Sequence, residues 1–382
     1  MQASRVSNER GMALAVAIFA LVVIGALVAG TFFAGRLEQQ SGQNTFYASQ
    51  ASEAAEAAIA QSLGGSLNSA TMLSLATNGG TTTLSSVSLG AHVVGTPSVT
   101  RLTSSVWLLK GKGERQNAAG TTVASRSLGQ LVRLNQANVK VKAGLTALGK
   151  VTVSGNSTVS GYDVTPSAWT AAAVDCPPLD DVAGVLYNGQ VTQQGSAVIK
   201  GDPNRDQDNT LNAGNMLGGS SFSQLKAMAT LILTGNVSGL APATTGTPAV
   251  CDASVQSNWG APTDKTSPCF NYFPIVYHEG DLSISGSGAG QGILLVNGNL
   301  NVQGTIDFYG PVIVTGGVNI RGTGSDDVKF YGGVMAQDVT LDDSKLTGNA
   351  MVNYSSCAIR RALQGSAKPI PLTERTWVQL YE

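Results

Sequence analysis

The sequence predicts an α+β protein in three parts: a long N-terminal transmembrane helix, a small antiparallel β region, and a mainly-β body folded as a parallel β-helix with an insertion. Three observations predict this fold class. An uncharged apolar run lies near the N-terminus, runs of alternating apolar and polar residues follow it, and a glycine-flanked repeat recurs through the rest of the chain. The 46 glycines and the low charged fraction, 12%, also favour a β-rich body with many tight turns.

Composition and motifs argue against several function classes. The 23 basic and 24 acidic residues nearly balance, and no basic block points to nucleic acid as a partner. The two histidines, His92 and His278, are far apart in the sequence, so a histidine-based metal or catalytic cluster is not expected. A phosphate-binding GxxxxGK[ST] loop and a GxSxG nucleophile elbow are both absent from the sequence. The sequence therefore predicts a protein that is not an enzyme and has no resident cofactor.

The first part is a candidate membrane anchor. Residues 1–11 are short and polar, with Arg5 and Arg10, and residues 12–35 are uncharged and apolar. That length suits one crossing of a bilayer, and the two arginines favour a cytoplasmic N-terminus with an exported body. A plain single-pass anchor is one alternative. A cleaved secretory signal is another, although it would have a shorter apolar core and a small-x-small cleavage site.

The helical pattern continues beyond the apolar run. Residues 46–63 are rich in alanine and carry Glu53 and Glu56, and no proline occurs before Pro97. One continuous helix over residues 12–63 is predicted, about 75 Å long at ~1.5 Å per residue. Its first half is apolar on all sides and its second half is small and amphipathic. This design suits a helix that lies first in lipid and later against other helices.

The segment ERG followed by MALAVAIFALVVIGALVAG resembles the class III leader of type IV prepilins. With the stretch ending in ASQASEAAEAAIAQ, residues 8–63 look most like the N-terminal domain of PilX-type minor pilins. The resemblance implies a leader over residues 1–11, cut after Gly11 by prepilin peptidase, and N-methylation of Met12. Major pilins usually carry a glutamate at the fifth mature position, where it pairs with the N-terminal amine of a neighbouring subunit. Here that position holds Val16, which favours a rare or terminal subunit.

The function implied is that of a minor pilin-like structural subunit of a type IV pilus or type II secretion-like filament. The implied partners are other pilin-like subunits, prepilin peptidase and, before assembly, inner-membrane lipid. The exported body would then serve assembly, adhesion or cargo contact, in a pilus or periplasmic filament. Two alternatives stay open: a passive envelope scaffold, and a membrane-anchored β-helix enzyme acting on polysaccharide. The enzyme would use the paired carboxylates Asp326, Asp327, Asp342 and Asp343, although aspartate is also common in ordinary turns.

Residues 84–138 are expected to form the small antiparallel sheet. Runs such as SVWLLKGKG and RSLGQLVRL alternate apolar and polar residues with a period of two. In small filament subunits such a sheet often lies against the exported half of the helix. We expect the same packing here.

Residues 139–382 carry the repeat x-G-x-apolar-x-apolar-x-G and are expected to form the β-helix. The third, fourth and fifth copies are spaced by 18 residues, and a degraded sixth follows after 21. A β-sandwich is the competing fold. Apolar alternates such as Leu300, Val302, Val318 and Ile320 would point inward. The six copies are Leu148–Gly155, Asn188–Gly195, Glu279–Gly286, Asn297–Gly304, Thr315–Gly322 and Ala336–Asp343.

An insertion is expected over residues 196–275, between the second and third copies. It contains a candidate helix, Ser221–Leu233. Insertions that leave a solenoid often form a lateral cap or binding face. The C-terminal tail, with Trp377 and Leu380, is expected to close the last coil, because an open coil end exposes unpaired strand edges.

Four cysteines allow two disulfides if the body is exported. Cys251 and Cys269 lie in one loop rich in proline, threonine and serine, so they are the natural pair. Cys176 with Cys357 then follows by elimination. Four free thiols are the alternative. Because no CxxC occurs, the spacing typical of zinc sites is absent.

One loop is a candidate for calcium. Asp202, Asn204, Asp206 and Asp208 alternate along it, as in the start of an EF-hand loop. Its sixth position holds Gln207 instead of glycine, and its twelfth carries no carboxylate. A solvated acidic turn is therefore the simpler interpretation.

Overall fold

The computed structural model describes residues 9–172, 174–321, 327–336, 344–347, 350–373 and 377–380. The chain divides into two compact units. The helix–sheet unit contains residues 1–67, 75–133 and 370–382, and the parallel-sheet unit contains residues 68–74 and 134–369. The helices are α1 (Glu9–Gln61), the π-helical turn η1 (Ser62–Ser66), α2 (Ser69–Ser74), α3 (Ser167–Ala171), α4 (Phe222–Ala227) and α5 (Ser356–Gly365).

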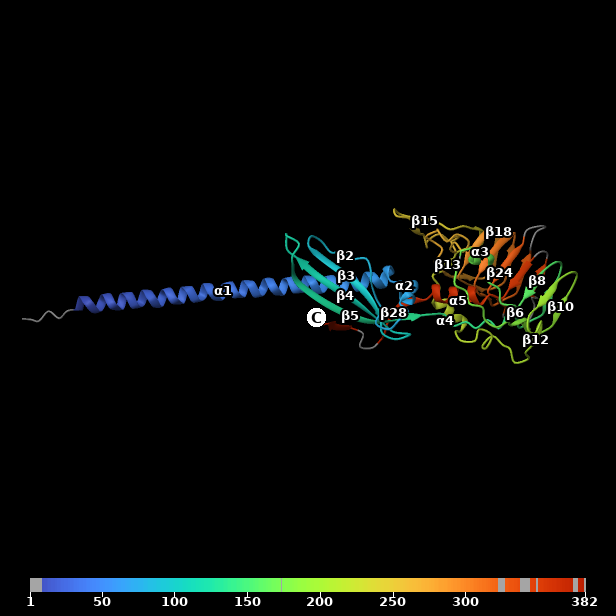
Figure 1. Ribbon diagram of the computed structural model, residues 1–382, viewed down its shortest axis with the longest axis horizontal. Helices are drawn as coiled ribbons and strands as arrows, with labels where there is room; N and C mark the ends of the chain where they lie inside the picture. Colours follow the sequence, from blue (N-terminus) through green and yellow to red (C-terminus); the bar gives the residue numbers. More distant parts are fainter. Residues whose placement is uncertain are drawn as a thin grey trace, which may run out of the picture. The chain divides into compact units, whose positions relative to one another are not determined.

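The predicted long apolar helix is present as α1, and it has two contrasting halves (Figure 1). Residues 14–46 are exposed, and this part of the helix is long and apolar enough to cross a membrane. Further along, buried residues recur three and four positions apart, which places them on one face of the helix. These buried residues are Ala51, Ala54, Ala55, Ala58, Ile59 and Ser62.

An antiparallel sheet packs against that face, as predicted from the alternating runs. Its strands follow the order β1-β3-β4-β5-β28, with β2 on β3 and β29 on β5. Buried and half-buried residues alternate along β3 and β4, so one side of the sheet faces α1. The strands are β1 (Thr81–Thr83), β2 (Val87–Ser88), β3 (Val93–Arg101), β4 (Trp107–Gln116), β5 (Thr122–Asn135), β28 (Lys368–Pro371) and β29 (Trp377–Leu380).

Three glycines let the backbone of α1 lie directly on the sheet. A Cβ atom at Gly95, Gly111 or Gly113 would collide with the carbonyl oxygen of Ala54, Ala55 or Ala51 respectively. Glycine within a strand often marks such a close backbone approach. The small alanines of the helix and the glycines of the strands therefore form one matched contact.

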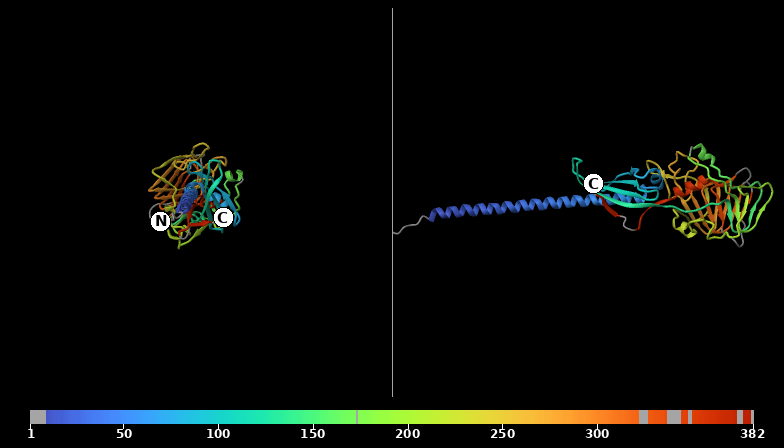
Figure 2. Two further views of the ribbon diagram at one scale, coloured as in Figure 1. Left: turned by 90° about the vertical axis from the view of Figure 1, so that its left-hand side faces the viewer. Right: turned by 60° about the horizontal axis from the view of Figure 1, so that its bottom comes forward.

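The parallel-sheet unit is mostly β (Figure 2). Its two large sheets are built from parallel pairings. One sheet has the order β12-β9-β6-β25-β22-β19-β17-β13. The other is curled: it runs β10-β7-β26-β23-β20-β18 and continues from β18 through β21-β24-β27-β8-β11, with β14 also on β18. Since β20 and β21 are consecutive in the chain and both pair with β18, the sheet bends around that strand.

The strands of this unit are short, and the antiparallel pair β15–β16 stands apart from the two parallel sheets. They are β6 (Ala143–Ala147), β7 (Val151–Val153), β8 (Thr158–Ser160), β9 (Ala183–Tyr187), β10 (Val191–Gln193), β11 (Val198–Lys200), β12 (Arg205–Gln207), β13 (Leu231–Leu233), β14 (Val237–Leu240), β15 (Thr244–Thr245), β16 (Val250–Cys251), β17 (Ile275–Glu279), β18 (Leu282–Gln291), β19 (Ile293–Asn297), β20 (Leu300–Gln303), β21 (Thr305–Tyr309), β22 (Val312–Val314), β23 (Val318–Arg321), β24 (Val328–Tyr331), β25 (Val334–Ala336), β26 (Ser344–Thr347) and β27 (Ala350–Asn353).

In the central repeats, each residue pairs with the residue 18 positions further along the chain, as the repeat spacing predicts. Leu282 pairs with Leu300, and Leu300 pairs with Val318, each 18 positions on. Leu300, Val302, Val318 and Ile320 are all buried in one apolar cluster, as predicted. Gly304 has φ +110°, and a Cβ there would meet the backbone of Gly286, one repeat earlier, so glycine is required at this corner.

The order of the repeats in space differs from their order in the chain. The first two copies contribute β7 and β10, yet β7 pairs with β26, which comes from near the end of the chain. In the same way β25 pairs with β6, and β27 pairs with β8. Strands from near the end of the chain therefore lie between the fifth copy and the first. The 21-residue step predicted for the sixth copy is not the register, because Ile320 pairs with Leu346, 26 positions on. In the sixth copy only Ala336 lies within the described residues, and it pairs with Val314, 22 positions earlier.

Two segment predictions are wrong in detail. The helix expected over Ser221–Leu233 ends at Ala227, and Leu231–Leu233 is strand β13, whose residues pair with β17. The C-terminal tail does not close a coil: Trp377 and Leu380 belong to β29, which pairs with β5 in the antiparallel sheet, and Trp377 is 53% exposed. The backbone groups of this segment form their hydrogen bonds with β5 instead of with the end of the coil. Within the expected insertion, residues 196–275, strands β11 to β14 join the parallel sheets.

Candidate functional site

The largest exposed apolar surface of the described residues is the first half of α1. Large side chains such as Leu14, Phe19 and Phe33 are all more than half exposed. Soluble monomers rarely show apolar surface on this scale, so it marks contact with lipid or with protein. Gly11 and Met12 lie in the first turns of this helix, and Val16 lies one turn further on. Val16 is 65% exposed, so its side chain is free to contact another molecule.

Both predicted cysteine pairs are disulfides in the structure. Cys251 and Cys269 are bonded, with their Cα atoms 4.8 Å apart, and they close a loop beside strand β16. Cys176 is bonded to Cys357 of α5, with a Cα–Cα distance of 5.3 Å and 181 positions between them in sequence. Together the two bonds use all four cysteines of the sequence.

The four candidate calcium ligands lie in and around the edge strand β12. Asp206 lies in edge strand β12, and Asp202 precedes it in an exposed turn. The Asp208 carboxylate instead accepts hydrogen bonds from the backbone N–H and the hydroxyl of Thr210, at 2.8 and 2.6 Å. These bonds lower the pKa of Asp208 below its usual value. Across the described residues, no three His, Cys, Asp or Glu side chains are grouped to hold a metal ion. Asn204, the fourth predicted ligand, is exposed in the same turn.

Of the four carboxylates considered for a polysaccharide-active enzyme, only Asp327 lies within the described residues. Its carboxylate stands 3.7 Å from the Lys329 ammonium group. Asp326, Asp342 and Asp343 lie outside the described residues. The described residues therefore do not bring two of these carboxylates together, and we assign no catalytic role to Asp327.

A polar cluster joins α4 to the parallel sheet. The Glu279 carboxylate accepts hydrogen bonds from the Tyr277 hydroxyl, from Lys226 at 3.0 Å and from Asn297 at 2.6 Å. The Lys226 ammonium also stands 4.7 Å from the centre of the Tyr277 ring. The bond from Tyr277, followed by those from Lys226 and Asn297, lowers the pKa of Glu279 to about 2. The ionised carboxylate thus links Lys226 of α4 to the sheet.

This cluster predicts an acid-sensitive contact. A carboxyl group whose pKa is lowered in the folded protein contributes stability above its unfolded pKa of 4.5, and loses it as the pH falls toward about 2. We therefore expect the urea midpoint of the wild type to fall more steeply between pH 4.5 and 2 than that of Glu279→Gln. The matched control is Glu56→Gln, which removes an exposed carboxylate of α1. Parallel pH profiles for the wild type and Glu279→Gln would contradict the prediction.

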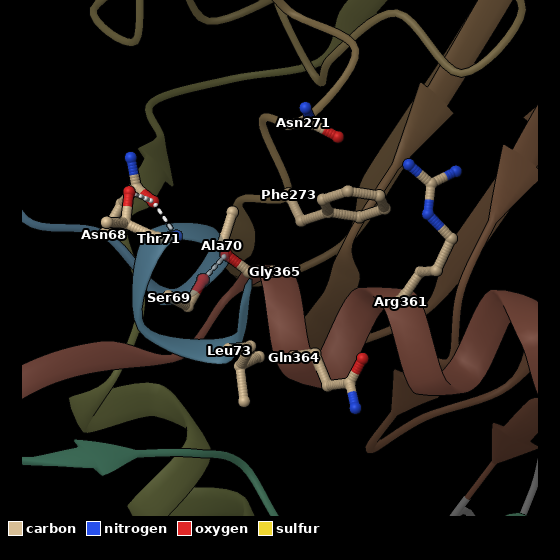
Figure 3. A pocket seen from close by; sticks show the side chains of 10 residues that line it. All are labelled: Asn68, Ser69, Ala70, Thr71, Leu73, Asn271, Phe273, Arg361, Gln364 and Gly365. Carbon is tan, nitrogen blue, oxygen red and sulfur yellow. Dashed lines mark hydrogen bonds between the residues drawn. The ribbon is translucent and has the colours of Figure 1, made fainter. Parts of the chain in front are cut away.

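A second site is a surface hollow of about 410 Å³ in the parallel-sheet unit (Figure 3). Figure 3 shows α2 on one side, α5 on another, and the loop before β17 between them. The Ser69 hydroxyl donates to the carbonyl oxygen of Gly365 at 3.4 Å, which ties α2 to the end of α5. The lining residues are Asn68, Ser69, Ala70, Thr71, Leu73, Asn271, Phe273, Arg361, Gln364 and Gly365.

Arg361 is the one charged residue in that lining. Its guanidinium carbon lies 4.4 Å from the centre of the Trp169 ring, 4.7 Å from that of Phe270 and 4.9 Å from that of Phe273. Burial among these rings lowers the pKa of Arg361 to about 10. No local sequence pattern predicts this hollow, because its walls come from three segments that are distant in the chain.

Searches against protein-family models, curated proteins and solved structures found no match to this chain.

Proposed function

We propose that this chain is a minor pilin-like structural subunit of a type IV pilus or type II secretion-like filament. In this proposal residues 1–11 are a leader removed by prepilin peptidase. The exposed half of α1 first holds the subunit in the inner membrane, with the body exported, and then packs against other pilin-like subunits. The body is displayed for assembly, adhesion or cargo contact, and no reaction is assigned to it.

One observation carries the proposal, and it is the division of α1 into an exposed apolar half and a half packed on an antiparallel sheet. A helix serving only as an anchor needs about 20 apolar residues. Here the helix continues to Gln61, and its alanine face is fitted to glycines of the sheet. A rigid helix joined to its own sheet can position a folded body relative to neighbouring helices. The resemblance of residues 8–63 to PilX-type minor pilins points the same way.

For the body, we propose that the two parallel sheets form a β-helix. The equal 18-residue register in β17–β19 and in β18–β20 supports successive turns of one coil. So does the single apolar cluster that collects inward side chains from both sheets. Two of the described strands at one end, β10 and β11, pair on one edge only. These free edges support the passive-scaffold alternative, because subunits that stack end to end need unpaired strands at which to join.

The test is the N-terminal mass of the protein expressed with and without prepilin peptidase. We expect loss of residues 1–11 and a methylated Met12 only when the peptidase is present. Gly11→Arg should block the cut, whereas Ser4→Ala, in the same leader, should be processed normally. An intact N-terminus in the presence of active peptidase would contradict the proposal, and so would a cut near Ala34.

A further inference from the structure

Arg361, which lines the hollow, is not explained by the packing of the parallel-sheet unit. The guanidinium of Arg361 is half-buried, and its Nη1 atom is buried without a hydrogen-bond partner among the described residues. Within the same residues it forms no ion pair, and burial is the single cause of its lowered pKa. A cation taken out of water in this way normally has an anion beside it.

The aromatic rings meet only part of that need. The guanidinium carbon lies over the rings of Trp169, Phe270 and Phe273, and these cation–π contacts position the group. The N–H groups of a guanidinium bind oxygen atoms, and the planar fork of an arginine fits the two oxygens of a carboxylate. The rings thus position a cation for which the described residues supply no anion.

The other lining residues indicate which groups a ligand would carry beside its negative charge. None of its residues is acidic, so the hollow carries net positive charge. The side-chain amides of Gln364 and Asn271 make no hydrogen bond to described residues, and each offers donors and an acceptor. Hydroxyl groups, which both donate and accept, are the natural partners of such amides. Asn68, by contrast, already accepts from the backbone and the hydroxyl of Thr71.

We propose that this hollow binds a small hydroxylated carboxylate of the sugar-acid class. The carboxylate pairs with Arg361, and ring hydroxyls bond with Gln364 and Asn271. The volume, about 410 Å³, lies in the range of small-molecule sites and has room for one sugar ring. The proposal uses residues of the parallel-sheet unit alone, so it stands whether or not α1 enters a filament.

The experiment is calorimetric titration of the full chain, in detergent, with D-glucuronate, D-glucose and acetate. We expect glucuronate to bind at least tenfold more tightly than either of the others, because glucose lacks the carboxylate and acetate lacks the hydroxyls. Arg361→Gln should weaken glucuronate binding by about tenfold or more, as expected for a hydrogen bond to a charged group. Arg360→Gln is the matched control: the neighbouring arginine bonds to the carbonyl oxygen of Asp175 and lies outside the hollow.

Arg361 also supports the packing of three rings, so Gln364→Ala provides a second, milder test. It should weaken glucuronate binding about threefold, with the near-ultraviolet circular dichroism unchanged. The proposal is overturned if glucuronate gives no binding heat, or if glucose or acetate binds as tightly. It is equally overturned if Gln364→Ala folds normally and keeps the full affinity, or if Arg360→Gln and Arg361→Gln lose affinity alike.

Discussion

Replacing Cys176 and Cys357 together by alanine is expected to lower the free energy of unfolding of the parallel-sheet unit by about 5 kcal/mol. The bond closes a loop spanning 181 positions, and the chain-entropy estimate rises with the length of the loop. The bond also joins the early and the late segments of the chain, whose strands β8 and β27 pair with each other. Cys176 lies between β8 and β9, while Cys357 lies in α5, directly after β27.

The matched control is the double variant Cys251→Ala with Cys269→Ala. That bond spans 18 positions, so a loss of about 3 kcal/mol is expected. Urea unfolding followed by the fluorescence of the buried Trp169 and Trp259 measures both variants. Equal losses from the two pairs would show that loop length is not what makes the long-range bond stabilising.

Substituting Gly113 by alanine is expected to destabilise the contact between α1 and its sheet by about 3 kcal/mol, and by valine even more. The new Cβ would occupy the position of the carbonyl oxygen of Ala51. That oxygen belongs to the helix backbone, so it cannot move aside as a flexible side chain could. Either the helix shifts along its whole packed length or the strand bends.

Hydrogen exchange of the α1 amides between Ala51 and Ser62 is the measurement. Protection there should fall in Gly113→Ala, while the amides of the parallel-sheet unit keep theirs. Gly42→Ala is the control, because a Cβ at Gly42 meets nothing within 4 Å and alanine favours a helix. Unchanged protection in Gly113→Ala would mean that the helix is not seated on the sheet through this glycine.

Much of the architecture is predictable from local patterns. The apolar run and the alanine-rich stretch give α1, and period-two alternation gives β3, β4 and β5. The 18-residue repeat gives the register of the central parallel strands. These features depend on neighbours in sequence or on a constant spacing. The disulfide pairs also followed, since one pair is local and only one other pairing remained.

What sequence could not give depends on which distant segments meet. Nothing in the repeat itself shows that β6 pairs with β25, or that the segment with Trp377 adds to β5. The Arg361 hollow is likewise assembled from three separate parts of the chain. One further contact does leave a mark in the sequence. Gly111 and Gly113 alternate with lysines inside a strand, and glycines at that spacing mark a face that another backbone approaches.

The interleaved order of the repeats has a consequence for how the protein is made. Synthesis delivers β6 to β11 early, but the strands that pair with β6, β7 and β8 on their other edge arrive almost last. Until then the early strands must wait with that edge unpaired, and open edges invite pairing with other chains. A nascent or truncated chain is thus more prone to aggregation than the finished one. The disulfide between Cys176 and Cys357 can form only after the last strands have paired with β6, β7 and β8. Its presence therefore marks a chain whose parallel sheets are fully assembled.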